Sequence, residues 1–244
     1  MTNKYMYFVA NWKMFGDLGT LNTLNKVITF VNKIKKNKFE LIYCPPSTLI
    51  YPLVKMLKKT SIEVGAQNCH ESESYGAHTG QLNSMMLKDV GAKYVILGHS
   101  ENRQSGENDR LVNLKIRSAI KSGLKVIFCI GETLSEKRKK ITKKILAQQI
   151  SKGLNNVKNK KAIFVAYEPV WAIGSGLIPG QPELIETIDY IKSKVKGAKV
   201  LYGGSVNPKN INNLKNINSI DGFLIGGASQ ESNNFIDIIK KTYN

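Results

Sequence analysis

The 244-residue sequence lacks long apolar runs and contains little cysteine. Near the N-terminus the longest apolar run, Tyr5–Ala10, covers only six residues. The core of a signal peptide usually needs about 7–15 apolar residues and a membrane-spanning helix about 20, so we expect neither. The three cysteines, Cys44, Cys69 and Cys129, cannot all pair within the chain, and none stands at CxxC spacing. This cysteine usage favours a reducing, cytoplasmic setting.

Arginine is also scarce. Only four of the 36 basic residues are arginines, and with 18 acidic residues the formal net charge is +18. Such a charge can mark a nucleic-acid binder, but those proteins usually favour arginine for its planar, forked side chain. Lysine clusters such as Lys137–Lys140 fall in helix-like stretches, where a solvated helix face is the ordinary explanation. We expect no specific nucleic-acid partner and no membrane partner.

The sequence does contain a regular alternation of apolar runs and helix-like segments. Eight runs rich in β-branched or aromatic residues recur at intervals of about thirty residues, and each is almost continuously apolar, which is typical of strands buried on both faces of a parallel sheet. The predicted strands are Tyr5–Ala10, Phe39–Tyr43, Ile62–Ala66, Tyr94–Leu97, Lys125–Cys129, Ala162–Tyr167, Lys199–Tyr202 and Gly222–Ile225.

Longer segments with helical spacing separate these runs, for example Leu18–Ile34 and the strongly basic Leu134–Leu154. Eight strands alternating with eight helical segments predict an α/β fold, a (β/α)8 barrel, which typically needs about 250 residues. A doubly wound open sheet shows the same alternation, but it usually has fewer strands, and no glycine-rich turn follows the first strand here. Because no linker divides the chain, we expect a single domain over residues 1–244.

Polar residues and glycines follow five predicted strands, at the end of such a barrel where active sites lie. Each one alone has an ordinary structural explanation, such as a solvent-facing lysine, a satisfied core histidine or a simple turn. Their convergence on one rim favours an active site, because independent structural causes would not select the same rim. The residues are Asn11 and Lys13, His99, Glu168, Gly203-Gly204-Ser205 and Gly226-Gly227.

Two features indicate what this rim would bind. Glycine pairs let backbone N–H groups approach phosphate oxygens closely, and the loops after the seventh and eighth strands are the usual phosphate site of these barrels. The segment from Glu168 to Gly176 is too apolar at Trp171–Ile173 for an idle surface loop, and it contains flexible glycines. We interpret it as a lid that excludes water from a ligand; the alternative is a permanently packed loop.

Other chemistries find little support. His70, His78 and His99 do not stand at metal-ligand spacing, so we expect no metal. The sequence contains neither a GxSxG nucleophile motif nor a Walker A phosphate-binding motif.

Seven motifs, in order along essentially the whole chain, resemble those of the triosephosphate isomerase family. Any one of them could arise by chance, but seven in register are a specific signal, and they imply a (β/α)8 barrel of the TIM type. The motifs are Asn11-Trp12-Lys13-Met14, Gly65-Ala66-Gln67-Asn68, Gly98-His99-Ser100-Glu101, Cys129-Ile130-Gly131-Glu132-Thr133, Tyr167-Glu168-Pro169-Val170-Trp171-Ala172-Ile173-Gly174, Tyr202-Gly203-Gly204-Ser205-Val206 and Asp221-Gly222-Phe223.

The resemblance implies a reaction, the cofactor-free interconversion of dihydroxyacetone phosphate and D-glyceraldehyde 3-phosphate through an enediolate, in glycolysis and gluconeogenesis. It implies that Glu168 carries a proton between adjacent carbons and that His99, as a neutral imidazole, polarises the carbonyl. Lys13 would stabilise negative charge, and Asn11 would position the oxyanion. The groups implied for phosphate binding are backbone groups of Gly174, Ser205, Gly226 and Gly227.

The resemblance further implies a homodimer, in which the loop at residues 67–81 inserts into the partner subunit. The sequence departs from the family pattern at one position in this loop and at one position directly after the Gly98-His99-Ser100-Glu101 motif. Relatives often have an acid where Gln81 stands and an arginine where Asn102 stands. Both departures concern the interface rather than the catalytic groups.

Two other functions stay open. Another sugar-phosphate isomerase or epimerase could use a phosphate-binding barrel, but a metal-dependent epimerase would need several His and Asp ligands at strand ends, where only His99 stands. A basic polyanion-binding protein is the more remote alternative, since it would not need Glu168, His99 and a lid together.

Overall fold

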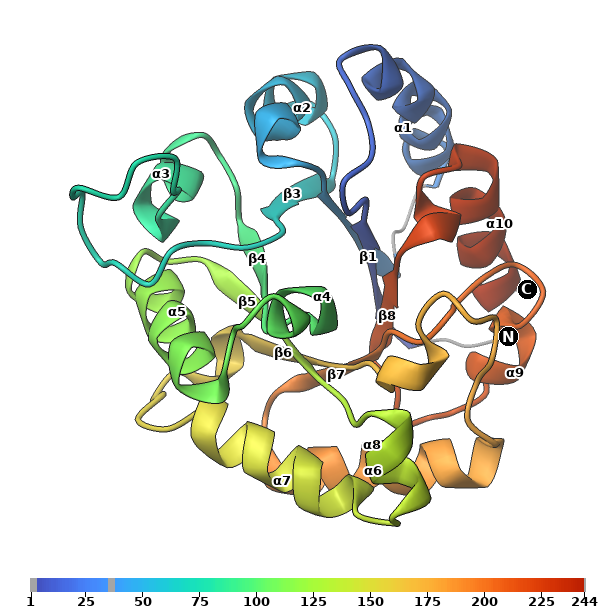
Figure 1. Cartoon of the computed structure of the whole chain (residues 1–244). Coiled ribbons are helices and arrows are strands. Elements are labelled where there is room, and N and C mark those ends of the chain that lie inside the picture. Colours follow the sequence, from blue (N-terminus) through green and yellow to red (C-terminus); the bar gives the residue numbers. More distant parts are fainter. Residues whose placement is uncertain (1–3, 35–37, 244) are drawn as a thin grey trace.

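The computed structural model describes residues 4–34 and 38–243. Eight parallel strands pair in sequence order and close on themselves, because β1 is hydrogen-bonded to both β2 and β8. Figure 1 shows this barrel surrounded by helices. The strands are β1 (Met6–Asn11), β2 (Phe39–Cys44), β3 (Ile62–Ala66), β4 (Tyr94–Leu97), β5 (Lys125–Ile130), β6 (Ile163–Tyr167), β7 (Lys199–Tyr202) and β8 (Gly222–Ile225). The predicted (β/α)8 barrel is confirmed.

The observed strand ends agree closely with the predicted ones. The bounds of β3, β4, β7 and β8 are those predicted. β2, β5 and β6 differ by one residue at one end, and β1 differs by one residue at both ends. At β1 the strand continues to the polar Asn11, which pairs in register with Cys44. Hydrogen bonding to the neighbouring strand therefore extends β1 beyond its apolar run.

Alternating side chains of the strands build two layers of core. One set fills the inside of the barrel, and the other packs against the surrounding helices, as period-two strand geometry requires. Inside lie Val9, Ile42, Ile96, Ile127 and Leu201, among others. Toward the helices face Phe8, Leu41, Val95, Val126 and Val165, among others. This packed scaffold holds the loops at the carboxyl ends of the strands in fixed relative positions.

The helices form the outer layer. They are α1 (Asn25–Asn32), α2 (Ile50–Leu57), α3 (Ser84–Asp89), α4 (Ser100–Gln104), α5 (Asp109–Lys121), α6 (Leu134–Arg138), α7 (Thr142–Gly153), α8 (Gln181–Lys194), α9 (Ile211–Leu214) and α10 (Ser232–Tyr243). In the described part of the chain they are accompanied by the 3-10 segments η1 (Gly19–Leu24), η2 (Ser47–Leu49), η3 (Lys160–Ala162), η4 (Val170–Ala172) and η5 (Gly227–Ser229). No helix in the described ranges is both long enough and apolar enough to cross a membrane.

The helical segment predicted over Leu134–Leu154 is divided in the structure. It breaks between α6 and α7 at Lys140, whose φ of +59° lies in the left-handed region. α6 buries none of its residues, so packing does not extend it, and the run of like charges at Lys137–Lys140 opposes a continuous helix. The segment predicted at Leu18–Ile34 likewise divides into η1 and α1.

Candidate active site at the carboxyl ends of the strands

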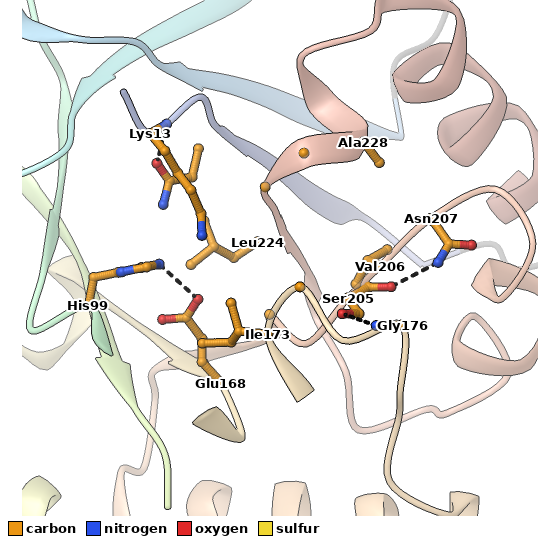
Figure 2. A pocket seen from close by; sticks show the side chains of 15 residues that line it. Lys13, His99, Glu168, Ile173, Gly176, Ser205, Val206, Asn207, Leu224 and Ala228 are labelled. Atoms are coloured by element: carbon orange, nitrogen blue, oxygen red, sulfur yellow. Dashed lines mark hydrogen bonds and ion pairs between the residues drawn. The ribbon is translucent and has the colours of Figure 1, made fainter. Parts of the chain in front are cut away.

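A cavity of about 250 Å³ opens at the carboxyl ends of the strands, the rim predicted to hold the active site. Its walls come from the segments that follow β1, β4, β6, β7 and β8 (Figure 2). All the residues predicted for catalysis or phosphate binding line it: Asn11, Lys13, His99, Glu168, Gly174, Ser205, Gly226 and Gly227. The barrel thus brings together residues that are far apart in the sequence.

Glu168 is the buried acid of this cavity. It follows the last residue of β6, and only 4% of it is exposed. Its backbone N–H donates to the carbonyl of Ile130 (2.8 Å), and Pro169 favours an extended backbone at Glu168. Its Oε1 lies 3.4 Å from Nε2 of His99, whereas Oε2 accepts no hydrogen bond from any described residue. Burying a carboxylate oxygen without a partner is costly, which is expected of a group that acts on a ligand.

The hydrogen bonds of His99 define its tautomer. His99 caps the start of α4, and its Nδ1 accepts a hydrogen bond from the backbone N–H of Glu101 (3.2 Å). Because Nδ1 is the acceptor, a neutral imidazole carries its proton on Nε2, the nitrogen that faces Glu168 in Figure 2. His99 therefore presents a hydrogen-bond donor to the cavity.

Glu168 and His99 shift each other's pKa in opposite directions. Burial is the largest single influence on Glu168 and raises its pKa. The charge of His99 and the hydrogen bonds from His99 and Cys129 lower the pKa, and together they make the net direction downward. Burial lowers the pKa of His99, but the carboxylates of Glu168 and Glu101 raise it, and the net direction is upward. The upward shift depends on Glu168 lying beside the ring.

Lys13 has a strained backbone that is held on both sides. Its φ of +54° lies in the left-handed region, which residues other than glycine seldom adopt. Its N–H donates to Oδ1 of Asn11 (3.0 Å), and the side-chain amide of Gln67, a residue that sequence analysis assigned no role, donates to its carbonyl (2.8 Å). The ammonium group forms an ion pair with Glu101. Strain maintained in this way is typical of functional positions.

The lid and the loop after β7 are joined at Ser205. The Ser205 hydroxyl accepts a hydrogen bond from the N–H of Gly176 (3.2 Å) and donates to the carbonyl of Ala172. Ser205 also has a positive φ, +42°, and its carbonyl accepts from the side chain of Asn207 (3.0 Å). Figure 2 shows the contact of Ser205 with Gly176 and the contact of Ser205 with Asn207. The apolar segment predicted to be a lid therefore rests on the predicted phosphate-binding loop.

The groups that line the cavity are suited to proton transfer and hydrogen bonding. His99 is its one histidine and Glu168 its one carboxylate. Across residues 4–34 and 38–243, no three His, Cys, Asp or Glu side chains gather in a way that could hold a metal ion. This rim therefore offers a carboxylate, an imidazole and an ammonium group.

Comparison with known proteins identifies the family. A family model described as triosephosphate isomerase matches residues 6–242. The triosephosphate isomerase of Thermodesulfovibrio yellowstonii is 40% identical to this chain, and the alignment covers 96% of this chain and 98% of that protein. The triosephosphate isomerase of Carboxydothermus hydrogenoformans is 39% identical, and the alignment covers 96% of this chain and 97% of that protein. The chain belongs to the triosephosphate isomerase family. A crystal structure of triosephosphate isomerase from Bartonella henselae aligns with a TM-score of 0.89 at 32% identity, covering 98% of this chain and 100% of that one.

Two glycines in triosephosphate isomerase motifs make room for Glu168. A Cβ atom at Gly131 would lie 1.8 Å from the carbonyl oxygen of Glu168, and one at Gly203 would lie 2.7 Å from its Cγ. No side chain fits at such distances. In the sequence, Gly131 stands out only as part of a motif and Gly203 as part of a predicted phosphate-binding turn. Their position directly after strands was the signal in the sequence that they belong to the site. That they must leave space for Glu168 is set by β6, the strand next to both β5 and β7.

Glu132 is a further buried carboxylate, to which sequence analysis assigned no role. It is fully buried and accepts hydrogen bonds from Nε1 of Trp171 (2.8 Å) and from the hydroxyl of Tyr167 (3.2 Å). Burial raises the pKa of Glu132, and the hydrogen bond from Trp171 opposes that shift. In this member of the triosephosphate isomerase family, the first part of the lid is therefore anchored to the loop after β5.

Proposed function

We propose that the chain is an aldose–ketose isomerase that interconverts dihydroxyacetone phosphate and D-glyceraldehyde 3-phosphate through an enediolate, without a cofactor. The observation that carries the proposal is the buried Glu168 carboxylate, which faces His99 and, within the described part of the chain, has no hydrogen bond to Oε2. A hydrogen on a carbon next to a carbonyl is weakly acidic. Its removal needs a base and fixed groups opposite the forming oxyanion, and this cavity offers both.

Each catalytic residue has one role in this proposal. Glu168 takes a proton from one carbon and returns it to the adjacent carbon. His99 donates from Nε2 to the carbonyl oxygen and moves protons between the two oxygens. Lys13 balances the negative charge of the enediolate and the phosphate, and Asn11 positions the oxyanion. Triosephosphate isomerase is itself the standard example of a carboxylate base acting with a neutral histidine, so these roles are transferred from the family to the matching residues.

We place the phosphate of the substrate at the glycine-rich end of the cavity. Backbone N–H groups can approach its oxygens closely there, because glycine has no Cβ atom. The lid above this end would exclude water, which protects the enediolate from losing its phosphate. The groups proposed to hold the phosphate are those of Gly174, Ser205, Gly226 and Gly227.

The two alternative functions account for less of the site. A metal-dependent epimerase would need several His and Asp donors at the strand ends, and the cavity has one histidine and one carboxylate. A polyanion-binding protein would have no use for a buried carboxylate beside a histidine of defined tautomer.

A coupled assay of both reaction directions tests the proposal. The purified chain should convert each triose phosphate into the other, and treatment with EDTA should leave the rate unchanged. In D2O, glyceraldehyde 3-phosphate formed from dihydroxyacetone phosphate should carry deuterium on carbon 2, because the proton held by Glu168 exchanges with solvent. Inversion of a secondary alcohol on a larger sugar phosphate, with no triose conversion, would favour the epimerase instead.

We also propose that the chain acts in the cytoplasm, in glycolysis and gluconeogenesis, as a homodimer formed through residues 67–81. Figure 1 shows the loop between β3 and α3 reaching outward beyond the helices. Tyr75 in this loop is 70% exposed, and Met14 in the loop after β1 is 99% exposed. Large apolar side chains exposed on loops are typical of interfaces. The free, buried Cys44, Cys69 and Cys129 suit a reducing compartment.

Light scattering during size-exclusion chromatography tests the dimer. Tyr75→Asp should convert a dimer into a monomer at micromolar concentration, because a carboxylate at the loop tip would be buried without a partner. Tyr51→Asp is the matched control, since Tyr51 is an exposed tyrosine on α2 outside the loop. A monomeric wild-type chain, or a Tyr75→Asp variant that stays dimeric, would contradict the proposal.

A further inference from the structure

Lys137 lies beside the lid, on the short helix that follows β5. α6 begins at a capping box in which Thr133 and Glu136 exchange hydrogen bonds, so its start is fixed although it buries no residue. From its last turn, Nζ of Lys137 reaches to 3.8 Å from the centre of the Trp171 ring. This distance is well within the range of about 6 Å for a cation–π interaction, and tryptophan is the strongest aromatic partner.

The same ammonium group is paired with α8. Nζ of Lys137 lies 2.8 Å from Oε1 and 3.0 Å from Oε2 of Glu183, which belongs to the first turn of that helix. Trp171 precedes the lid glycines Gly174 and Gly176 in the chain, and Glu183 follows them. Lys137 therefore connects the segment that enters the lid with the helix that follows it.

The other contact of Trp171 is at the edge of its ring. Nε1 donates to the buried Glu132 carboxylate (2.8 Å), so the edge of the indole has a polar anchor while its face has a cation. A ring that is held only at one edge can rotate about that contact, whereas the second contact on its face restricts the rotation. Trp171 follows Glu168 by three residues in the chain and stands at the start of the lid segment, so these two contacts fix where that segment leaves β6.

We propose that Lys137 is a positioning residue of the lid, whose ammonium group holds the face of Trp171 and ties it to Glu183, and so keeps the lid over the cavity during turnover. The inference rests on the proposed function, because a tightly held lid matters only if a water-sensitive intermediate forms beneath it. Lys137 does not line the cavity and acts through Trp171. Its positive charge is the essential property, since the aromatic ring and the carboxylate both attract a cation.

The chain contains a matched control for this contact. Lys143, on α7, pairs with Glu186 of α8 at 2.5 Å, and its Nζ lies 5.6 Å from the centre of the Tyr190 ring. It thus combines an ion pair to α8 with an aromatic contact, as Lys137 does, but none of these partners belongs to the lid. A general loss of contacts with α8 would appear in variants of both lysines, and a loss of lid positioning only in variants of Lys137.

The experiment compares Lys137→Met, Lys137→Arg and Lys143→Met in the full chain. It measures kcat, KM and the inorganic phosphate released per isomerisation turnover. We expect Lys137→Met to lower kcat/KM by about threefold to tenfold, as the loss of a cation–π contact predicts. It should also raise phosphate release per turnover severalfold, because under a loose lid the electron pair of the enediolate can expel phosphate from the adjacent carbon. Lys137→Arg should restore both values, and Lys143→Met should behave as the wild type.

Thermal unfolding of each variant checks its fold. If Lys137→Met is too unstable to assay, Glu183→Gln removes the ion pair from the other side and should shift phosphate release in the same direction. Equal behaviour of Lys137→Met and Lys143→Met, or no rescue by arginine, would overturn the inference while leaving the proposed function intact. A wild-type chain that fails to isomerise triose phosphates would instead overturn the proposed function.

Discussion

Two buried carboxylates stand at opposite ends of the barrel and have opposite surroundings. Asp221 precedes β8 at the amino end of the strands and is 5% exposed. Its oxygens are paired with Lys4 (2.8 Å) and Lys192 (2.9 Å), and Oδ2 also accepts the N–H of Val200 (2.8 Å). Glu168, at the carboxyl end, is 4% exposed, and no lysine or arginine forms an ion pair with it among the described residues; its contact with His99 is longer, at 3.4 Å.

The difference separates stability from chemistry. A buried charge destabilises the folded chain unless partners replace its lost hydration, so the fully paired Asp221 is placed to stabilise the barrel. The less completely paired Glu168 keeps an oxygen available for a substrate. This division agrees with the general behaviour of (β/α)8 barrels, in which the carboxyl end carries function and the amino end stability.

The largest expected effect is on catalysis at the carboxyl end. Glu168→Gln should lower kcat by about 10²–10⁴-fold, the usual contribution of a positioned base, because it removes the base and preserves its shape. Asp221→Asn should leave kcat nearly unchanged in the same coupled assay. Affinity for a substrate-like phosphate inhibitor, measured by calorimetry, should be largely retained in Glu168→Gln. An equal loss of activity and inhibitor affinity would show that Glu168 is a binding or structural residue.

The reverse order is expected for stability. Asp221→Asn should lower the free energy of unfolding by about 2–3 kcal/mol, less than a fully buried ion pair would lose, because both of its lysines are about one-third exposed. Glu168→Gln should lower it by less than Asp221→Asn does, because Glu168 forms no ion pair with a lysine among the described residues and its Oε2 has no hydrogen-bond partner there. Urea unfolding followed by circular dichroism measures both. Equal destabilisation by the two variants would remove the distinction between the two ends.

The smallest expected effect is the pH dependence of this stability. Burial raises the pKa of Asp221, but Lys4 and the Val200 N–H lower it more, and the net direction is below the ordinary value of 3.8. Since the pKa is lower in the folded chain, the pairing stabilises above about pH 3.8, and this stabilisation is lost as the pH falls through that value toward the folded pKa.

Urea unfolding of the wild type and Asp221→Asn at several pH values tests this dependence. The gap between their free energies of unfolding should be wide near neutral pH and should shrink below about pH 4. A gap that stays constant into acid would mean that the charge of Asp221 is not what stabilises the amino end.

Much of the molecule follows from patterns in the sequence. Continuously apolar runs predicted all eight strands to within a residue at each end, because strands buried on both faces admit few polar residues. The rim residues Lys13, His99 and Glu168 were found because parallel strands alternating with helices must all end on the same side. The break at Lys140 was missed, since helical periodicity does not show whether a helix face will be buried.

The sequence by itself determined the barrel, the rim that carries the site and the identities of its polar groups, because these depend on local periodicity and on strand order. The tertiary structure decided the state of those groups. The tautomer of His99 depends on the backbone N–H that its ring meets, and the orientation of Glu168 depends on two glycines from neighbouring strands. The cation–π contact that we propose positions the lid is made by Lys137, which is more than thirty residues from Trp171 in the chain. Such contacts are set by the distance between elements in space, which no local pattern in the sequence records.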